Sequence, residues 1–170
     1  MVYEEINKLK VFIRRSNLQN KEDIEHIKKQ IEIANQNKNP YINEEFPSDD
    51  ILNTELLNYC IESLELVKFI IGLGGSPNFI EHHGRLPIFD AIAYKQHEVA
   101  EYLFHLTHFD CSDAYACQAF RYLFDKDYKE FYPILRSILF RCKREHIISG
   151  RSCYRRLRDL CHLQITQGYL

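Results

Sequence analysis

The chain has 170 residues, of which 45% are hydrophobic and 27% are charged, an ordinary balance for a globular protein. A chain of this length can bury enough surface to fold around one core, so we expect one domain that needs neither a metal nor a disulfide for stability. The formal net charge of -2 argues against nucleic-acid or anionic-membrane binding by the chain as a whole.

The N-terminal sequence and the apolar runs indicate whether the protein is secreted or inserted in a membrane. The first ten residues, MVYEEINKLK, have no apolar segment after a basic start, so we expect no secretory signal. No apolar run approaches the roughly 18 residues of a membrane span, and the longest, Phe69–Leu73, is far shorter. We therefore expect a cytoplasmic protein without membrane contact, in which the six cysteines are reduced thiols.

Apolar residues recur at helical spacing along most of the chain, and no segment is a convincing strand. Glycine and proline mark the boundaries: Gly74–Gly75 should end a helix in the left-handed cap conformation, and Pro87 suits a first helical position. The predicted helices cover 2–15, 21–37, 48–63, 64–73, 87–95, 97–107, 112–124, 127–144 and 151–165. Helices of this length with short connections predict an all-α, antiparallel array.

Two of these segments are similar to one another. The sequence LELVKFIIGL at 64–73 aligns with HEVAEYLFHL at 97–106, so that Glu65 matches Glu98 and Ile70 matches Leu103. The two glutamates lie 33 residues apart, which is the period of ankyrin repeats.

The residues between the two similar segments resemble an ankyrin-repeat junction. The sequence GGSPN at Gly74–Asn78 is similar to the family's G-A-D-P-N segment, and GRLPIF at Gly84–Phe89 stands where the family has G-x-T-P-L-H. Ala91–Ile92 occupies the place of the family's paired alanines, where a small residue lets paired helices approach closely. The resemblance is clear over residues 55–108 and degenerate elsewhere.

The chain also departs from the family pattern. Leu86 and Phe89 replace Thr and His, so the hydrogen bond of those side chains is absent, and Lys95–Gln96 replaces Gly-His. The first helix of the repeat before the junction should be shorter than its counterpart. The resemblance implies an all-α, ankyrin-like helical-repeat solenoid flanked by capping helices, which repeat arrays need at both ends. Its parts are N-terminal capping helices at 1–40, repeats at 48–140 and a basic C-terminal capping helix at 145–170.

The resemblance implies a protein partner, because loop tips and first-helix residues form the concave binding surface in this family. We expect a non-catalytic protein–protein interaction module without a cofactor, in the form of a small stoichiometric inhibitor such as a bacterial immunity protein that neutralises a cognate toxin. A pathogen or viral ankyrin effector that binds a host factor is the alternative. Carried over by position, the exposed partner-binding residues are Ile80, His82, His83, Arg85, Asp90, Ala93 and Tyr94. Tyrosine and arginine often anchor interfaces, although the two histidines would also suit a solvated turn.

Metal binding and catalysis are less favoured. Histidines and cysteines gather in two places, one with His105, His108, Cys111 and Cys117 and the other with Cys142, His146, Cys153, Cys161 and His162. Neither group has the paired short spacings of a zinc site, so we expect no metal. No G-x-S-x-G, Walker A, H-E-x-x-H or G-x-G-x-x-G motif occurs, and the repeat explains Glu98 beside His97, so we expect no enzyme.

Charge is distributed unevenly along the chain. Residues 1–82 carry 9 Lys and Arg against 14 Asp and Glu, whereas residues 136–170 carry 8 against 2. A secondary basic patch of Arg151, Arg155, Arg156 and Arg158 spans about two helical turns. The patch could contact nucleic-acid phosphates, meet an acidic protein surface, or be the solvated face of a capping helix. Nucleic-acid binding is therefore a second alternative function, less favoured than a protein partner.

Overall fold

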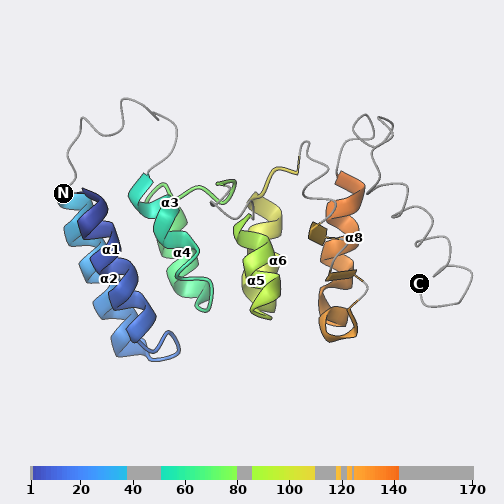
Figure 1. The fold of residues 1–170 in the computed structure, drawn as a ribbon, viewed down its shortest axis with the longest axis horizontal. Helices are drawn as coiled ribbons and strands as arrows, with labels where there is room; N and C mark the ends of the chain where they lie inside the picture. The colour runs from blue at the N-terminus through green and yellow to red at the C-terminus, as the bar shows by residue number, and fades with distance from the viewer. Residues whose placement is uncertain are drawn as a thin grey trace, which may run out of the picture. The chain divides into compact units, whose positions relative to one another are not determined.

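The computed structural model in Figure 1 describes residues 2–37, 51–79, 86–109, 118–119, 122–123 and 125–141. The chain divides into two compact units, Met1–Thr107 and His108–Leu170, and each is described by itself. The described residues form helices and no strands, which confirms the all-α prediction for this part of the chain. No helix within these ranges has the length and apolar character needed to cross a membrane. The single domain expected from length stays a prediction.

The described part of the first unit is a series of paired helices (Figure 1). Contacts join α1 to α2, α3 to α4 and α5 to α6, so helices that follow one another in the chain pack as pairs. The pairs are linked by contacts of α1 with α3, α2 with α4 and α4 with α6. The helices are α1 (Val2–Arg15), α2 (Lys21–Gln36), α3 (Ile51–Leu57), α4 (Leu64–Gly72), α5 (Pro87–Ala93) and α6 (His97–Leu106).

The core of this unit is formed by the apolar stripes that the helical spacing predicts. Except for α3, the helices begin and end within about two residues of the predicted bounds, which is the usual scatter of helix ends. Each stripe recurs every three or four residues and therefore lies on one side of its helix. The buried stripe residues of α1 and α2 are Ile6, Leu9, Ile13, Ile24, Ile27, Ile31 and Ala34.

The two aligned segments are buried alike. Leu66 and Ile70 of α4 are completely buried, and so is Leu103 of α6, while Val99 is only 2% exposed. Phe69 and its match Tyr102 are both half-buried, and the two matched glutamates are both exposed. Equivalent positions of the two segments therefore have equivalent surroundings.

Glycine is needed where α4 ends, as predicted. Gly74 has a φ of 97°, in the left-handed region that favours glycine. The amide of Gly74 donates to the Ile71 carbonyl, and that of Gly75 donates to the Ile70 carbonyl, both at 3.0 Å. This pair of bonds is a Schellman motif. A Cβ on Gly75 would lie 2.8 Å from Cγ2 and 3.0 Å from the carbonyl oxygen of Ile70, so glycine is also required by space.

Buried polar side chains of α3 hold the segment that follows α4. Asn53 has no exposed surface and exchanges two hydrogen bonds with the Asn35 amide, at 2.9 and 3.0 Å. It also donates to the Leu73 carbonyl at 3.0 Å, while Thr54 accepts from the amide of Ser76 at 2.9 Å. The turn after α4 is therefore tied to α2 and α3 by partly buried hydrogen bonds.

The predicted extent of α3 is wrong at its C-terminal end. The helix ends at Leu57, and residues 58–63 form turns. Ser63 belongs to the next element, because it is the N-cap of α4 and accepts from the Leu66 amide at 3.5 Å. Cys60 and Ile61 are buried although they are not helical, and their apolar side chains therefore fit the sequence pattern of a helix that continues past Leu57.

The predicted shortening of the first helix stays a prediction. The described parts of α3 and α5 each have 7 residues, and α3 begins directly after residues that the structure does not describe. The two pairs differ in their connections, since 58–63 links α3 to α4, whereas only 94–96 links α5 to α6. The longer connection supplies side chains to the site described below.

The second unit is described over a few short ranges. Its 3-10 helix η2 (Lys126–Phe131) leads into α8 (Tyr132–Arg141). The prediction of one α-helix over 127–144 is confirmed for α8 and wrong for its first turn, where Tyr128 (φ −114°, ψ 22°) makes a kink. Residues 118–119 and 122–123, inside the predicted helix 112–124, are helical. The predicted helix at 151–165 lies outside the described residues.

Candidate functional site

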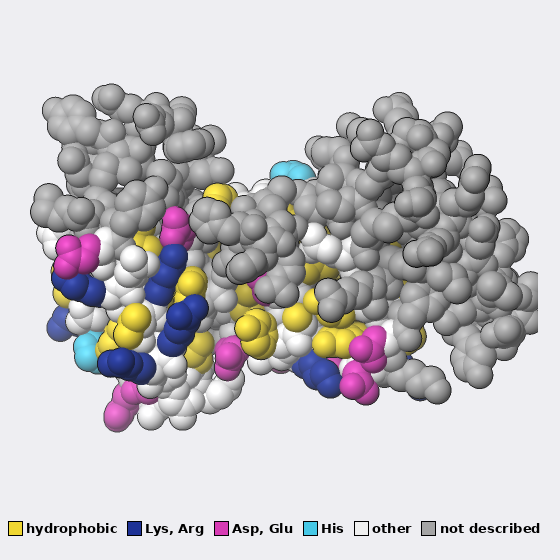
Figure 2. Space-filling model, in the orientation of Figure 1, with side chains coloured by type: hydrophobic (Ala, Val, Ile, Leu, Met, Phe, Trp, Pro, Cys, Tyr) yellow, Lys and Arg dark blue, Asp and Glu magenta, His cyan; other side chains and the backbone are white. Residues whose placement is uncertain are grey.

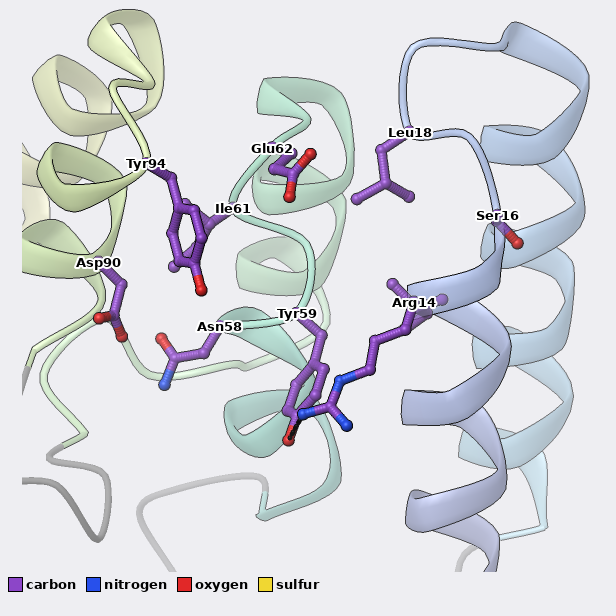
Figure 3. Close-up of a pocket in the computed structure, with 10 residues that line it drawn as sticks. Arg14, Ser16, Leu18, Asn58, Tyr59, Ile61, Glu62, Asp90 and Tyr94 are labelled. Carbon is purple, nitrogen blue, oxygen red and sulfur yellow. Dashed lines mark hydrogen bonds between the residues drawn. The ribbon is translucent and has the colours of Figure 1, made fainter.

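A cavity of about 420 Å³ lies in the first unit, where turns of the three helix pairs meet (Figure 3). Its wall comes from the end of α1 and the turn after it, from the connection between α3 and α4, and from α5 with the residue that caps it. Such a volume is in the range of small ligand sites and of pockets that accept one or two side chains. The lining residues are Ile13, Arg14, Ser16, Leu18, Asn58, Tyr59, Ile61, Glu62, Asp90 and Tyr94.

An arginine stacked on a tyrosine forms one side of the cavity. The guanidinium carbon of Arg14 lies 4.7 Å from the centre of the Tyr59 ring, and its Nη2 donates to the Tyr59 hydroxyl at 3.3 Å (Figure 3). Lys10 also lies over this ring, at 5.2 Å, and forms an ion pair with Glu55 at 2.5 Å. The Tyr59 ring and the Arg14 charge are thus already engaged with each other.

The side-chain amide of Asn58 lies beside this pair. Its Oδ1 and Nδ2 atoms are both buried, and neither has a hydrogen-bond partner among the residues that the structure describes. Burying an amide without partners costs free energy, so such groups are uncommon in folded proteins. Figure 3 shows the Asn58 amide and the Asp90 carboxyl pointing toward one another at the cavity.

Tyr94 lies at the edge of the cavity and is the C-cap of α5. It is 61% exposed, which agrees with the exposure predicted for it, and its backbone amide donates to the Asp90 carbonyl at 2.9 Å. Among the described residues, no ring or cation stacks on the Tyr94 side chain. The ring is therefore exposed at the edge of a cavity whose wall also includes the carboxyl groups of Asp90 and Glu62.

The exposure predicted for Asp90 is wrong. Asp90 is only 4% exposed, because every residue of α5 from Pro87 to Ile92 is buried and the helix has no solvent-facing side there. Asp90 is still part of the cavity wall, although its Oδ1 atom is itself buried. Ala93 is half-buried and does not line the cavity.

The other predicted site residues are not described by the structure. Ile80, His82, His83 and Arg85 lie outside the described residues, as does the basic patch of Arg151, Arg155, Arg156 and Arg158. Their roles stay predictions. Of the predicted set, the structure brings together Asp90 and Tyr94.

Several residues of the cavity were not predicted. Arg14, Asn58, Tyr59 and Glu62 come from parts of the chain that the repeat comparison did not treat as a surface. Tyr59 falls inside the predicted helix at 48–63, whereas in the structure it follows the end of α3. The one sequence signal was the extra length between the two helices at 58–63, since residues inserted into a repeat lie on the outside of the packed helices.

Charge on the visible surface is concentrated near the first helix pair. In Figure 2, lysine and arginine side chains gather over α1 and α2 on the face drawn. Two of the cations closest to the cavity are engaged, Lys10 by Glu55 and Arg14 by Tyr59. Within the cavity wall itself, the carboxyl groups of Glu62 and Asp90 outnumber the one guanidinium.

Metal and thiol chemistry gain no support within the described residues, where no three His, Cys, Asp or Glu side chains gather as a metal site requires. Cys60 has no exposed surface, and burial raises the pKa of its thiol to about 12. It is therefore not a thiolate nucleophile at neutral pH. His105 and His108 lie at the end of α6 and just after it, while the cysteines expected near them lie outside the described residues.

Comparisons with known proteins do not assign a family. Searches of protein-family models, of curated proteins and of solved structures found no match to the chain. The ankyrin resemblance therefore stays a prediction from the residues that carry it.

Proposed function

We propose that the chain is a non-catalytic protein-binding module built of ankyrin-like helical repeats. The interpretation of the helices as ankyrin-like repeats is supported by the equal burial of matched residues in α4 and α6 and by the Schellman motif at Gly74–Gly75. The observation that carries the binding role is the cavity at the turns of three helix pairs, with the exposed Tyr94 at its edge. Tyrosine is enriched among residues that dominate the energy of protein interfaces.

The concrete form we propose is a small stoichiometric inhibitor, such as an immunity protein that neutralises a toxin. An ankyrin effector that binds a host protein would use the same surface and differs in the identity of the partner. Nucleic-acid binding was predicted from the basic patch near the C-terminal end, and no observation on the described residues favours it.

The test is capture of a partner by the full chain from a lysate of the source cells. The wild type is compared with Tyr94→Ala, and Ile33→Ala is the matched control, because Ile33 is also exposed (41%) but does not line the cavity. We expect one stoichiometric protein, held by the wild type and by Ile33→Ala, whose affinity falls about 30-fold in Tyr94→Ala, the effect of losing a typical interface anchor.

Two results would contradict the proposal. One is capture of nuclease-sensitive material alone. The other is a protein that binds Tyr94→Ala as tightly as wild type, provided that circular dichroism shows equal helix content in the three chains.

A further inference from the structure

The exposed arginine of the cavity wall, Arg14, has no carboxylate partner among the residues that the structure describes. Its guanidinium stacks on the Tyr59 ring and donates one hydrogen bond, from Nη2 to the Tyr59 hydroxyl at 3.3 Å. None of the ion pairs within the described residues includes Arg14. A guanidinium has five N–H donors, so only one of those of Arg14 is bound to another described residue.

Stacking on Tyr59 orients the Arg14 guanidinium without occupying its edge. The ring covers one face of the group, with 4.7 Å between the guanidinium carbon and the ring centre, whereas the N–H groups point outward in the guanidinium plane. The geometry of these N–H groups matches a carboxylate, to which arginine can donate two parallel hydrogen bonds. Because the stack restricts the side chain beforehand, Arg14 loses less freedom on binding than an arginine that is free in solvent.

The charged groups around the Tyr59 ring carry a net positive charge. Lys10 lies over the same ring at 5.2 Å, and its charge is balanced by the ion pair with Glu55. Arg14 is the second cation on the ring, and no second carboxylate of the described residues lies within ion-pairing distance of it. Two cations therefore face one carboxylate, and one added carboxylate neutralises the cluster.

The two carboxyl groups of the cavity wall do not pair with Arg14. Asp90 is only 4% exposed and has an interaction of its own, and its Oδ1 atom is buried. Glu62 is exposed, and Figure 3 shows its carboxyl away from the stacked side chains of Arg14 and Tyr59. A carboxylate for Arg14 is therefore left for another molecule to supply.

We propose that Arg14, held on Tyr59, binds an aspartate or glutamate side chain of the partner protein. This inference rests on the proposed protein-binding function and names the charge that the partner presents at the cavity. Phosphate groups of a nucleic acid are the competing anion, since arginine binds them in the same way. Residues 1–82 carry 9 Lys and Arg against 14 Asp and Glu, and this excess of acids repels a polyanion more strongly than a single carboxylate.

The experiment is titration of the ¹⁵N-labelled full chain at constant ionic strength, followed through the side-chain Nε–H signals of Arg14 and Arg15. Arg15 is the internal reference, because it is also exposed but neither lines the cavity nor lies over an aromatic ring of the described residues. The probe is acetyl-Gly-Asp-Gly-amide at millimolar concentrations. Its matched probes are acetyl-Gly-Asn-Gly-amide, which has a similar shape without the charge, and inorganic phosphate.

The aspartate peptide should bind Arg14 about three- to tenfold more tightly than Arg15, because the stacked side chain loses less freedom on binding. The asparagine peptide should leave both signals unchanged. In Tyr59→Leu, which lacks the ring, the affinities at the two arginines should become equal. Tyr59→Phe keeps the ring and should keep the preference for Arg14, and urea unfolding of both variants shows that they are folded.

A captured partner gives a second measurement, with variants of the same exposed side chains. Arg14→Gln should weaken binding of the partner about tenfold or more, as expected for an interface arginine, whereas Arg15→Gln should have little effect. Glu62→Gln removes a like charge from the cavity wall and should therefore bind the partner at least as tightly as wild type.

The inference is overturned if the aspartate peptide shifts neither signal or binds both arginines equally, or if the asparagine peptide binds Arg14 as tightly. A larger preference for Arg14 over Arg15 with phosphate than with the aspartate peptide would assign the site to phosphate groups instead. Equal binding of the partner by Arg14→Gln and Arg15→Gln would also overturn it. These outcomes are distinct from failure of the proposed function. A partner that depends on Tyr94 but not on Arg14 removes only the carboxylate assignment, whereas absence of any captured protein removes the protein-binding role.

Discussion

The clearest test of how α5 ends concerns Lys95, the residue that follows Tyr94. It has a φ of 58°, the left-handed conformation, and no other described non-glycine residue has a positive φ. Its amide donates to the Ile92 carbonyl at 3.0 Å, and the Gln96 amide donates to the Ala91 carbonyl at 2.8 Å. These bonds are the same Schellman pair that glycine makes after α4, so α5 ends in a glycine conformation without a glycine.

The expected magnitude follows from the cost of that conformation. A side chain in the left-handed region costs about 1–2 kcal/mol, and glycine gives back about 0.5–1 kcal/mol through its larger loss of backbone entropy on folding. Lys95→Gly should therefore raise the free energy of unfolding by about 0.5–1 kcal/mol relative to Lys95→Ala. Alanine is the proper reference because both variants lack the lysine side chain and its interactions.

The assay is urea unfolding followed by circular dichroism, with all variants measured in parallel. Gly74→Ala, at a φ of 97°, provides the reciprocal change and should lower stability by about 1 kcal/mol or more. Equal stability of Lys95→Gly and Lys95→Ala, together with a neutral Gly74→Ala, would refute the claim that both helices end in this motif.

Three further predictions concern the same unit. Asn53→Ala should lower the free energy of unfolding by about 2 kcal/mol in denaturant titrations, because it removes the hydrogen bonds of Asn53 with the Asn35 side chain and with the Leu73 carbonyl, and a neutral change would mean that this network adds no stability. The hydrogen bond and charge of Lys28 lower the pKa of Glu65 below its ordinary value of 4.5. The stabilisation of the fold by this ion pair is therefore present above pH 4.5 and is lost as the pH falls through the lower pKa of Glu65 in the folded state. Stability measured from pH 7 to pH 3 should then fall less steeply in Glu65→Gln than in wild type, and parallel curves would count against this ion pair. Burial raises the pKa of the Cys60 thiol to about 12, so Cys60 should stay unmodified by iodoacetamide at pH 8 until urea unfolds the chain. Peptide mass spectrometry measures the modification, and rapid labelling of Cys60 in the native protein would contradict its burial.

Much of the helical framework could be predicted because it depends on local periodicity. The spacing of Ile24, Ile27 and Ile31 identifies one buried side of α2 without knowledge of its neighbours. The end of α4 was also predictable, since Gly74–Gly75 has few roles other than a left-handed cap.

The misplaced end of α3 has a different cause. Cys60 and Ile61 are completely or nearly completely buried in a turn, and apolar composition alone does not separate a buried turn from a helix. In the same way, the family pattern placed Asp90 on a surface, whereas burial of its neighbours along α5 leaves no surface there.

The cavity could not be predicted because it is a product of tertiary structure. Arg14, Asn58 and Tyr94 come from three connections that lie far apart in the sequence, and no periodicity links them. What the sequence contained was the longer connection at 58–63, without an indication of which side chains it would bring to the turn after α1. A partnerless amide such as that of Asn58 is visible only once its surroundings are known.

The central claim is that a partner protein binds at this cavity, and hydrogen–deuterium exchange of the full chain with and without the captured partner tests it most directly. Binding at the cavity predicts added protection in two segments, the connection at 58–63 and the capping turn at 94–96, with α2 away from the cavity unchanged as the internal reference. Protection confined to other segments, or none in these two at saturating partner, would contradict the claim and assign recognition to another surface.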